Sequence, residues 1–109
     1  MEYPNAGDLI FIDFNPQAGH EQAGRRPALV LSPSSYTKIT KLSIMCPVTS
    51  RKKGYPFEVD LPKGLKISGV VLTDQIKCLD ISARRAEIRD SVPSEILSEV
   101  REKLKTLLF

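Results

Sequence analysis

The sequence predicts a small, mainly β protein of the α+β class: an antiparallel barrel or half-barrel with one helix packed against it. Short runs of apolar and β-branched residues recur along residues 9–88 and are separated by segments containing Gly, Pro or charged residues, which is typical of many short strands. Residues 93–108 instead repeat apolar side chains at helical spacing. With 109 residues, 41% hydrophobic and 27% charged, the chain is expected to form one domain over residues 1–109.

The first half of the chain contains three predicted strands. Residues 9–14 combine β-branched and aromatic residues around Asp13, and residues 28–32 form a short apolar run with proline on both sides, which indicates a buried strand. Residues 34–40 are polar, and we interpret them as a turn of helix with a loop. The third strand covers residues 42–48 and ends at a basic loop.

The second half continues the pattern. Residues 56–61 alternate between apolar residues expected to face inward and acidic residues expected to face outward: Phe57, Val59 and Leu61 against Glu58 and Asp60. Two further strands are expected at residues 69–73 and 76–79, on either side of Asp74 and Gln75. Residues 81–88 are mixed and charged, which indicates an edge strand.

The C-terminal helix is predicted from six apolar residues that fall on one face: Ile96, Leu97, Val100, Leu104, Leu107 and Leu108. Pro93 suits the first turn, where a missing N–H costs nothing. Acidic residues near the start and lysines near the end complement the helix dipole. We therefore expect the apolar face to pack on the core and not to bind a ligand.

Composition limits the function classes. The net charge of +3 and pI near 9.0 permit a nucleic-acid partner. The first residues lack the pattern of a signal peptide, and no apolar run reaches the ~18 residues needed to cross a bilayer, so we expect a cytoplasmic protein without a membrane partner. Cys46 and Cys78 lie in strand-like segments and are expected to be buried free thiols. With a single histidine in the chain, we expect no metal site and no cofactor.

Residues 19–27 are the most informative segment, because they combine His20, Glu21, Arg25 and Arg26 between two glycines. Arg binds phosphate oxygens in pairs, and Glu or His moves protons near neutral pH, so this set suits a phosphodiester. The alternative is a loop of solvated ion pairs. Other basic residues cluster in the same way: Arg51, Lys52 and Lys53, then Arg84 and Arg85 with Arg89. Brought together they would follow a phosphate backbone, and apart they would be solvated loops.

Nearly the whole chain carries ordered motifs: Gly7-Asp8-Leu9-Ile10, Asp13-Phe14-Asn15-Pro16, Gly19-His20-Glu21-Gln22-Ala23-Gly24, Arg26-Pro27-Ala28-Leu29-Val30-Leu31-Ser32-Pro33, Pro47-Val48-Thr49-Ser50, Gly54-Tyr55-Pro56-Phe57-Glu58-Val59 and Gly69-Val70-Val71-Leu72-Thr73-Asp74-Gln75. In this order they resemble the MazF/PemK family of toxin endoribonucleases. The resemblance implies a compact SH3-like twisted sheet with a C-terminal helix. It also implies a homodimer, a small acidic antitoxin, single-stranded RNA as substrate, and operator DNA bound only together with the antitoxin.

The resemblance also implies site residues. Arg26 and Thr49 match the catalytic pair, Glu21 matches an acid that positions or deprotonates the 2′-hydroxyl, and His20 matches a histidine of some members. Asp74 and Gln75 match a dipeptide near the substrate groove. The further RNA-binding candidates are basic: Arg25, Arg51, Lys52, Lys53 and Arg84. Some relatives have a catalytic arginine where this chain has Leu72. In this chain we therefore expect Arg26 to carry the main catalytic role. As alternatives, Thr49 simply ends a strand, Asp74 is a turn residue, and His20 is a solvated loop residue.

The implied reaction is attack of a 2′-hydroxyl on the adjacent phosphorus, giving a 2′,3′-cyclic phosphate and a 5′-hydroxyl. One rival function is a gyrase poison of the same fold, which relies on a C-terminal Trp motif that this Trp-free chain lacks. The other is a non-catalytic RNA-binding barrel. Aromatic residues make up only 6% of the chain and several are expected to be buried, so RNA affinity would rest on charge. Residues 34–40 and 50–54 are expected to set the cleavage sequence.

Overall fold

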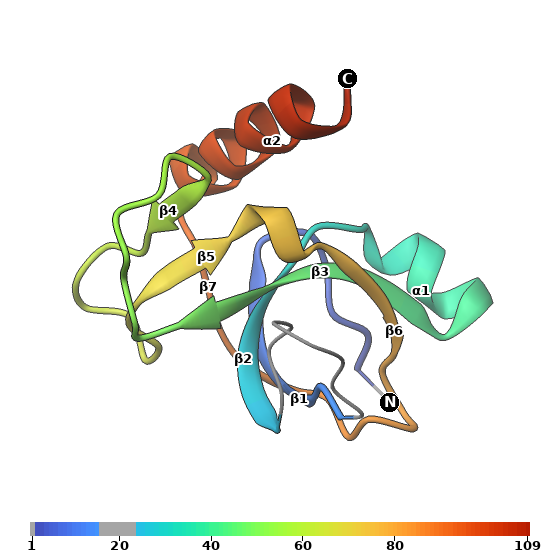
Figure 1. Ribbon diagram of the computed structural model, residues 1–109. Coiled ribbons are helices and arrows are strands. Elements are labelled where there is room, and N and C mark those ends of the chain that lie inside the picture. The colour runs from blue at the N-terminus through green and yellow to red at the C-terminus, as the bar shows by residue number, and fades with distance from the viewer. Residues whose placement is uncertain (1, 16–23) are drawn as a thin grey trace.

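The computed structural model describes residues 2–15 and 24–109. Within them the chain forms an antiparallel seven-stranded sheet and a C-terminal helix, which confirms the predicted class (Figure 1). The elements follow in this order: β1 (Asp8–Asp13), β2 (Arg25–Val30), α1 (Ser34–Thr40), β3 (Leu42–Thr49), β4 (Glu58–Asp60), β5 (Val70–Leu72), the 3₁₀ turn η1 (Thr73–Gln75), β6 (Lys77–Asp80), β7 (Glu87–Ser91) and α2 (Ser94–Leu108). None of the described helices is long and apolar enough to cross a membrane.

The strand β3 organises the sheet. One edge of β3 pairs with β2, and the other edge pairs with β6 over Leu42–Met45 and with β5 at Val48 and Thr49. The path runs β4-β5-β3-β2-β1-β7, so β4 and β7 end it (Figure 1). The sheet is therefore twisted and open, the half-barrel form of the prediction.

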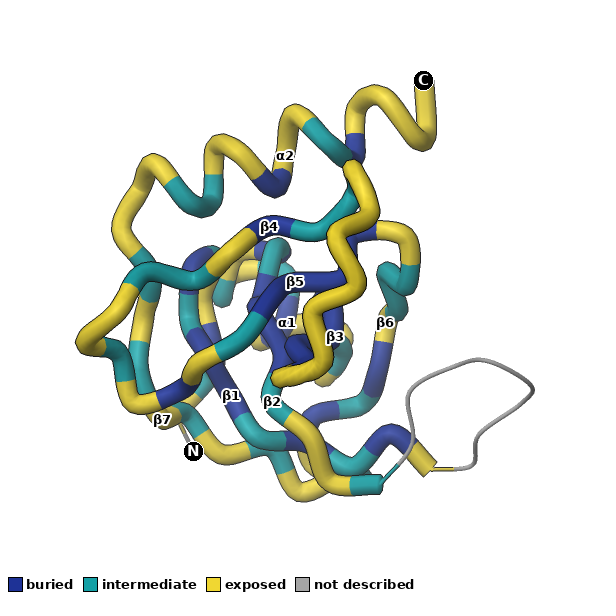
Figure 2. The backbone as a smooth tube through the Cα atoms, turned by 60° about the vertical axis from the view of Figure 1, so that its left-hand side comes forward, coloured by how far each residue is buried: buried dark blue, intermediate teal, exposed yellow. Residues whose placement is uncertain are grey.

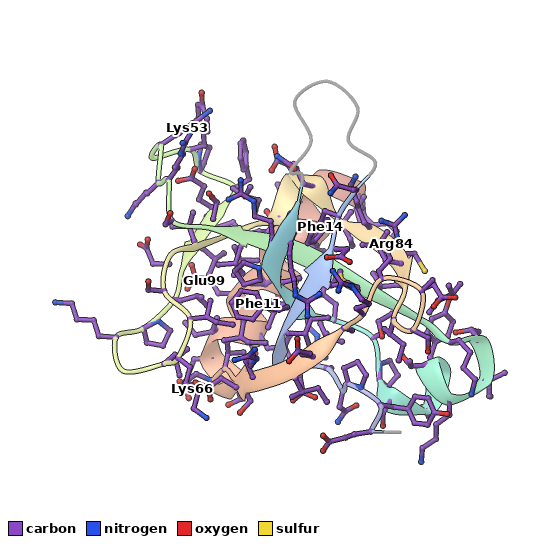
Figure 3. All side chains as sticks on the ribbon, turned by 90° about the horizontal axis from the view of Figure 1, so that it is seen from below. Phe11, Phe14, Lys53, Lys66, Arg84 and Glu99 are labelled. Carbon is purple, nitrogen blue, oxygen red and sulfur yellow. The ribbon has the colours of Figure 1, made fainter. Side chains whose placement is uncertain are left out.

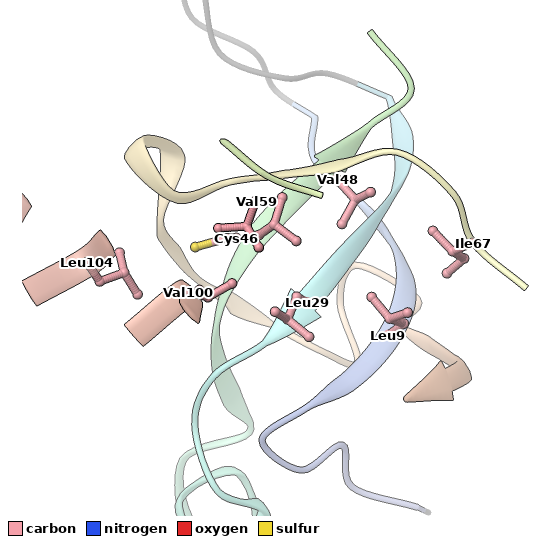
Figure 4. Packing of buried hydrophobic residues seen from close by; sticks show 9 residues of the cluster. Leu9, Leu29, Cys46, Val48, Val59, Ile67, Val100 and Leu104 are labelled. Atoms are coloured by element: carbon pink, nitrogen blue, oxygen red, sulfur yellow. The ribbon is translucent and has the colours of Figure 1, made fainter. Parts of the chain in front are cut away.

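The core lies on both faces of the sheet, because successive side chains of a strand point to opposite faces. One cluster packs beneath α2, where Val100 and Leu104 meet residues such as Leu9, Leu29 and Cys46 (Figure 4). The second cluster, which includes Ile10, Ile12, Phe14 and Met45, fills the opposite face. Both clusters are buried along the central strands, whereas α2 is mostly exposed (Figure 2).

Several predicted boundaries are corrected. Residues 34–40 are helical throughout, and β2 begins at Arg25, three residues before the expected start. The predicted edge strand at 81–88 is wrong in its first part: residues 81–85 form a turn, and β7 begins at Glu87. The Asp80 carboxylate accepts the N–H groups of Ser82 and Ala83 at 2.9 and 2.8 Å. A local side-chain acceptor thus replaces the strand ladder there.

The apolar face of α2 is buried only over its middle. Val100 and Leu104 are buried, and Ile96 and Leu97 pack against the core. Leu107 and Leu108 are 49% and 56% exposed, so the prediction that they join the core is wrong. The helix extends beyond the edge of the sheet at its C-terminal end (Figure 1). Helical periodicity therefore predicted the apolar face of α2 correctly. The width of the sheet decides how much of that helix face packs against the core.

The two cysteines differ. Cys46 is fully buried in the core, as predicted, and burial, with a smaller contribution from Asp74, raises the pKa of its thiol to about 12. Cys78 is exposed, so the prediction for it is wrong. The Cys78 sulfur lies 3.8 Å from the Tyr36 hydroxyl. Cys46 is on β3 in the middle of the sheet, whereas Cys78 is on β6, a strand off the main path.

Candidate active site

Strand pairing brings Arg26 and Thr49 together. β2 and β3 are antiparallel, with Ala28 opposite Pro47. Continuing this register by two residues places Arg26 opposite Thr49. Both side chains line one cavity of about 230 Å³. The pair that the resemblance implied from distant sequence positions is therefore adjacent in space.

The cavity is bounded by β2, β3, β4, β5 and the loop between β3 and β4. Its lining residues are Arg26, Thr49, Arg51, Lys53, Tyr55, Phe57, Glu58 and Leu72. Three of them are cationic and one is acidic, so the cavity has a net positive lining. Such a lining attracts phosphate, and arginine binds phosphate through two parallel hydrogen bonds. Leu72 supplies an apolar wall at the position where some relatives carry arginine.

The β3–β4 loop, residues 50–57, is held by several hydrogen bonds. The Thr49 hydroxyl accepts the Arg51 N–H at 3.2 Å. The Glu58 carboxylate accepts the N–H groups of Lys53 and Gly54, the latter at 2.9 Å. Gly54 has φ +84°, a conformation that other residues rarely adopt. These contacts hold the loop backbone, and with it the cationic side chains, at the mouth of the cavity.

The backbone of Gly69 packs closely against the backbone of Thr49. Its φ is +127°, and a Cβ atom at Gly69 would lie 2.2 Å from the Thr49 carbonyl oxygen. Two backbone segments therefore approach more closely than any residue with a side chain permits. Only glycine lets the segment leading into β5 lie this close to the end of β3, where Thr49 joins the cavity.

Three basic candidates are not brought to this cavity. Arg25 points to the other face of β2 and pairs with the carboxylates of Asp13 and Glu87. Arg84 donates to the carbonyl oxygens of Asp13 and Asn15 at 3.1 and 2.7 Å, and it lies across the molecule from Lys53 (Figure 3). Lys52 pairs with Asp60 at 3.0 Å. Of the predicted RNA-binding cations, Arg51 and Lys53 line the cavity.

Asp74 and Gln75 lie in η1, directly after the cavity residue Leu72, and neither lines the cavity. Partial burial, and after it the nearby Glu58 carboxylate, raise the pKa of the Asp74 carboxyl against an opposing backbone hydrogen bond. The Glu58 carboxylate therefore disfavours the charged form of Asp74. The part that this dipeptide plays in RNA binding stays a prediction.

His20 and Glu21 lie outside the described residues, and their roles stay predictions. The ends of their segment are placed beside β1 and β2. The Phe14 N–H donates to the Gly24 carbonyl at 2.9 Å, and the Gly24 N–H donates to the Asn15 side chain at 3.1 Å. Gly24 precedes β2 by one residue, so the segment joins the sheet two residues from Arg26.

Sequence reasoning missed three lining residues: Tyr55, Phe57 and Glu58. Alternation was read as placing Phe57 in the core and Glu58 in solvent, yet both are half-buried in the cavity wall. The block Gly54-Tyr55-Pro56-Phe57-Glu58-Val59 was the available signal, since it repeats a family motif on a loop. Among the residues that the structure describes, no group of three or more His, Cys, Asp or Glu side chains is placed to hold a metal ion.

Known proteins match this chain over almost its full length. The family model for PemK-like, MazF-like toxins of type II toxin–antitoxin systems matches residues 5–108. The endoribonuclease toxin MazF of Escherichia coli K12 is 45% identical over 105 residues, which cover 96% of this chain and 94% of the relative. The endoribonuclease PemK of Escherichia coli is 36% identical, covering 94% of this chain and 80% of the relative.

Solved structures agree with the sequence matches. The crystal structure of MazF from Deinococcus radiodurans superposes with a TM-score of 0.96 at 57% identity, covering 99% of this chain and 98% of that one. MazF in a MazE–MazF complex from the same organism superposes with a TM-score of 0.90 at 57% identity, covering 99% of this chain and 97% of that one. Sequence and fold therefore agree that the chain belongs to the family of PemK-like, MazF-like toxins of type II toxin–antitoxin systems.

Proposed function

We propose that the cavity around Arg26 and Thr49 is the active site of an endoribonuclease that cuts single-stranded RNA at a defined sequence without a metal ion. Family membership makes the chain a MazF-like endoribonuclease toxin, and the proposal adds the residues and the chemistry. The observation that carries it is the gathering of Arg26, Thr49, Arg51 and Lys53 on one cavity. The rival gyrase poison would rely on a C-terminal Trp motif, and the chain has no Trp.

The reaction begins when a 2′-hydroxyl attacks the adjacent phosphorus. A base takes the 2′ proton, the phosphorane charge is stabilised, and the 5′-oxygen leaves with a proton donated by Arg26 or His20. Arg26 stabilises the charged oxygens, because fixed donors aimed at developing charge are the largest catalytic contribution. Thr49 donates its hydroxyl hydrogen to a phosphate oxygen while accepting the Arg51 N–H. Glu21 is the proposed base for the 2′-hydroxyl, and His20 a further proton carrier or RNA contact.

The cations explain how the reaction proceeds without a metal. Metal ions in phosphoryl chemistry neutralise developing charge and orient oxygens. Arg26, Arg51 and Lys53 offer positive charge at the same place. We expect full cleavage of a long RNA in excess EDTA, with ends mapped to a short common sequence and bearing 2′,3′-cyclic phosphate. Cleavage lost on chelation and restored by Mg²⁺ would contradict the proposal.

The partners follow the same proposal. A homodimer and a small acidic antitoxin are supported by the apolar residues exposed at the end of α2: Leu107, Leu108 and Phe109. Exposed apolar patches mark protein interfaces, and a basic cavity suits an acidic segment that folds on binding. Operator DNA would be bound only with the antitoxin, and the toxin would act on mRNA in the cytoplasm. Light scattering that finds only monomer at micromolar concentration would contradict the dimer.

A further inference from the structure

We infer that Tyr55 is a stacking platform for one nucleobase of the single-stranded RNA, beside the scissile phosphate. The position beside the phosphate rests on the proposed function. The stacking itself rests on the geometry of Tyr55 and Phe57 in the cavity wall.

The Tyr55 ring has one stacked aromatic partner, and the residue is half exposed. It stacks on Phe57 with ring centroids 5.2 Å apart and an interplanar angle of 27°. Tyr55 is 51% exposed, whereas Phe57 is half-buried. The outer aromatic is thus supported from beneath by the inner one. Successive stacking of bases on such rings is how proteins bind single-stranded nucleic acid.

Hydrogen bonds hold the backbone on both sides of Tyr55. The Glu58 N–H donates to the Tyr55 carbonyl at 3.1 Å, and the Glu58 carboxylate accepts from Gly54 on the other side of Tyr55. Pro56 has a fixed φ, and its carbonyl accepts a hydrogen bond from the Lys103 ammonium of α2. Because the ring is held by a loop tied to both β4 and α2, binding a base costs little ordering entropy.

The surroundings of Tyr55 match a nucleotide and not an apolar peptide. The cavity that Tyr55 lines also contains Arg26, Arg51 and Lys53, so phosphates on either side of a stacked base would meet cations. The inference adds base stacking to the charge on which RNA affinity was expected to rest. Aromatic residues are few in the chain, but the structure places two of them together at the cationic cavity.

The absence of Trp from the chain allows a direct optical test. In the Y55W variant the single indole would stack on a base, and its fluorescence is expected to be quenched by a short RNA whose scissile 2′-hydroxyl is replaced by hydrogen. Scanning that RNA with single abasic nucleotides should abolish the quench at one position only. The Y3W variant is the matched control, because Tyr3 contacts Lys41 after α1 and does not line the cavity; its fluorescence should not change.

Affinity gives the second readout. Tyr55→Ala should weaken binding of the uncleavable RNA by about tenfold or more, as expected for loss of one stacked base, and Tyr55→Phe should bind like the wild type. The loss should vanish on the RNA that is abasic at the identified position. The inference would be overturned if quenching persisted at every abasic position, or if Tyr55→Ala bound the RNA within twofold of wild type. Tyr55 would then be assigned to contact with a protein partner.

The two proposals fail separately. RNA that quenches the Y55W variant but is never cut in its all-ribose form would support the base site and contradict the nuclease. RNA that is cut equally well by wild type and Tyr55→Ala, with no abasic-dependent quenching, would contradict the base site and support the nuclease. Failure to bind RNA at all would overturn both.

Discussion

The neighbouring residues Arg25 and Arg26 show that a shift of one position along a strand changes the surroundings of a side chain. They follow each other on β2, so their side chains point to opposite faces of the sheet. Arg25 is engaged by Asp13 and Glu87 on one face, and Arg26 lines the cavity on the other. Two adjacent residues of the same type therefore have different surroundings, and only Arg26 of the two lines the cationic cavity.

The first prediction concerns Arg26. Arg26→Ala should lower the single-turnover rate on a short chimeric substrate by about 10²-fold or more, like loss of one oxyanion donor. Arg26→Lys should recover little, since an ammonium lacks the paired donor geometry. His20→Ala should cost less than Arg26→Ala. Arg101→Ala is the control, because Arg101 is exposed on α2 and is not a lining residue.

The order of these effects is the test. An Arg26→Ala enzyme within a few-fold of wild type, alongside an inactive His20→Ala enzyme, would replace the Arg26 mechanism with one centred on histidine.

The second prediction distinguishes the two thiols. At about pH 8 a disulfide reagent should modify Cys78 rapidly in the folded protein, because Cys78 is exposed and the thiolate is the reactive form. Cys46 should react only after denaturation, since it is fully buried and its pKa is about 12. The Cys78→Ser variant should show no rapid reaction. Rapid modification of that variant would show that β3 opens readily.

At the scale of elements, the meeting of β3 and β5 determines the shape of the site. Val48 and Thr49 pair with Val71 and Val70, and Gly69 passes against the Thr49 carbonyl. Leu72 and Glu58 then pair across β5 and β4 and form the neighbouring wall. The cavity is therefore built from ends of strands, and its geometry depends on backbone contacts as much as on side chains.

The third prediction follows from Gly69. Gly69→Ala should destabilise the protein by about 2 kcal/mol or more, because the new Cβ meets a backbone carbonyl that cannot move without shifting β3. Cleavage should fall further than stability explains, since Thr49 is displaced. Gly64→Ala is the matched control: Gly64 also has positive φ, but nothing lies within 4 Å of its Cβ position. Urea unfolding of both variants measures the difference, and equal midpoints would exclude the close-contact explanation.

Across the whole molecule, an ion-pair network joins strands that are distant in sequence. Asp13 on β1 pairs with Arg25 and Arg85, and Glu87 on β7 pairs with Arg25 and Arg89. The network links β1, β2, β7 and the turn before β7 on the face away from the cavity. The Arg85 hydrogen bond holds the pKa of Asp13 below its usual value, and the Arg25 hydrogen bond does the same for Glu87.

The fourth prediction is that acid weakens the fold through this network. A carboxyl whose pKa is lower folded than unfolded contributes stability above its unfolded pKa, and loses it as pH falls through the folded value. The unfolded values are 3.8 for Asp13 and 4.5 for Glu87, so the free energy of unfolding should fall from about pH 5 downward. Asp74, with a raised pKa, acts in the opposite direction.

The midpoint of urea unfolding, measured at several pH values, checks the predicted loss of stability in acid. The Asp13→Asn variant should show a shallower fall than wild type, and added salt should reduce the difference because these groups are partly exposed to solvent. Stability that rises on acidification, or an Asp13→Asn curve parallel to wild type, would assign the acid response to other groups.

Sequence by itself determined the β-rich class, the positions of most strands, the C-terminal helix and its apolar face, and the candidate pair Arg26 and Thr49. These depend on patterns that a residue shares with its neighbours along the chain: alternation, helical spacing and ordered motifs. Boundaries were less well determined, as residues 81–86 show, because the Asp80 carboxylate offers the backbone other partners.

Only the tertiary structure decided which faces are covered and which charges meet. In the structure Cys78 and Leu107 are exposed to solvent. Arg25 and Arg84 do not line the cavity, whereas three residues that the sequence did not indicate do line it: Tyr55, Phe57 and Glu58. The physical reason is that burial and ion pairing depend on the strand or helix that comes alongside, and strand register is set by contacts between residues far apart in the chain. A periodic pattern predicts the face of the strand or helix on which a side chain lies. The element that packs against that face determines whether the side chain is buried and which residues it contacts.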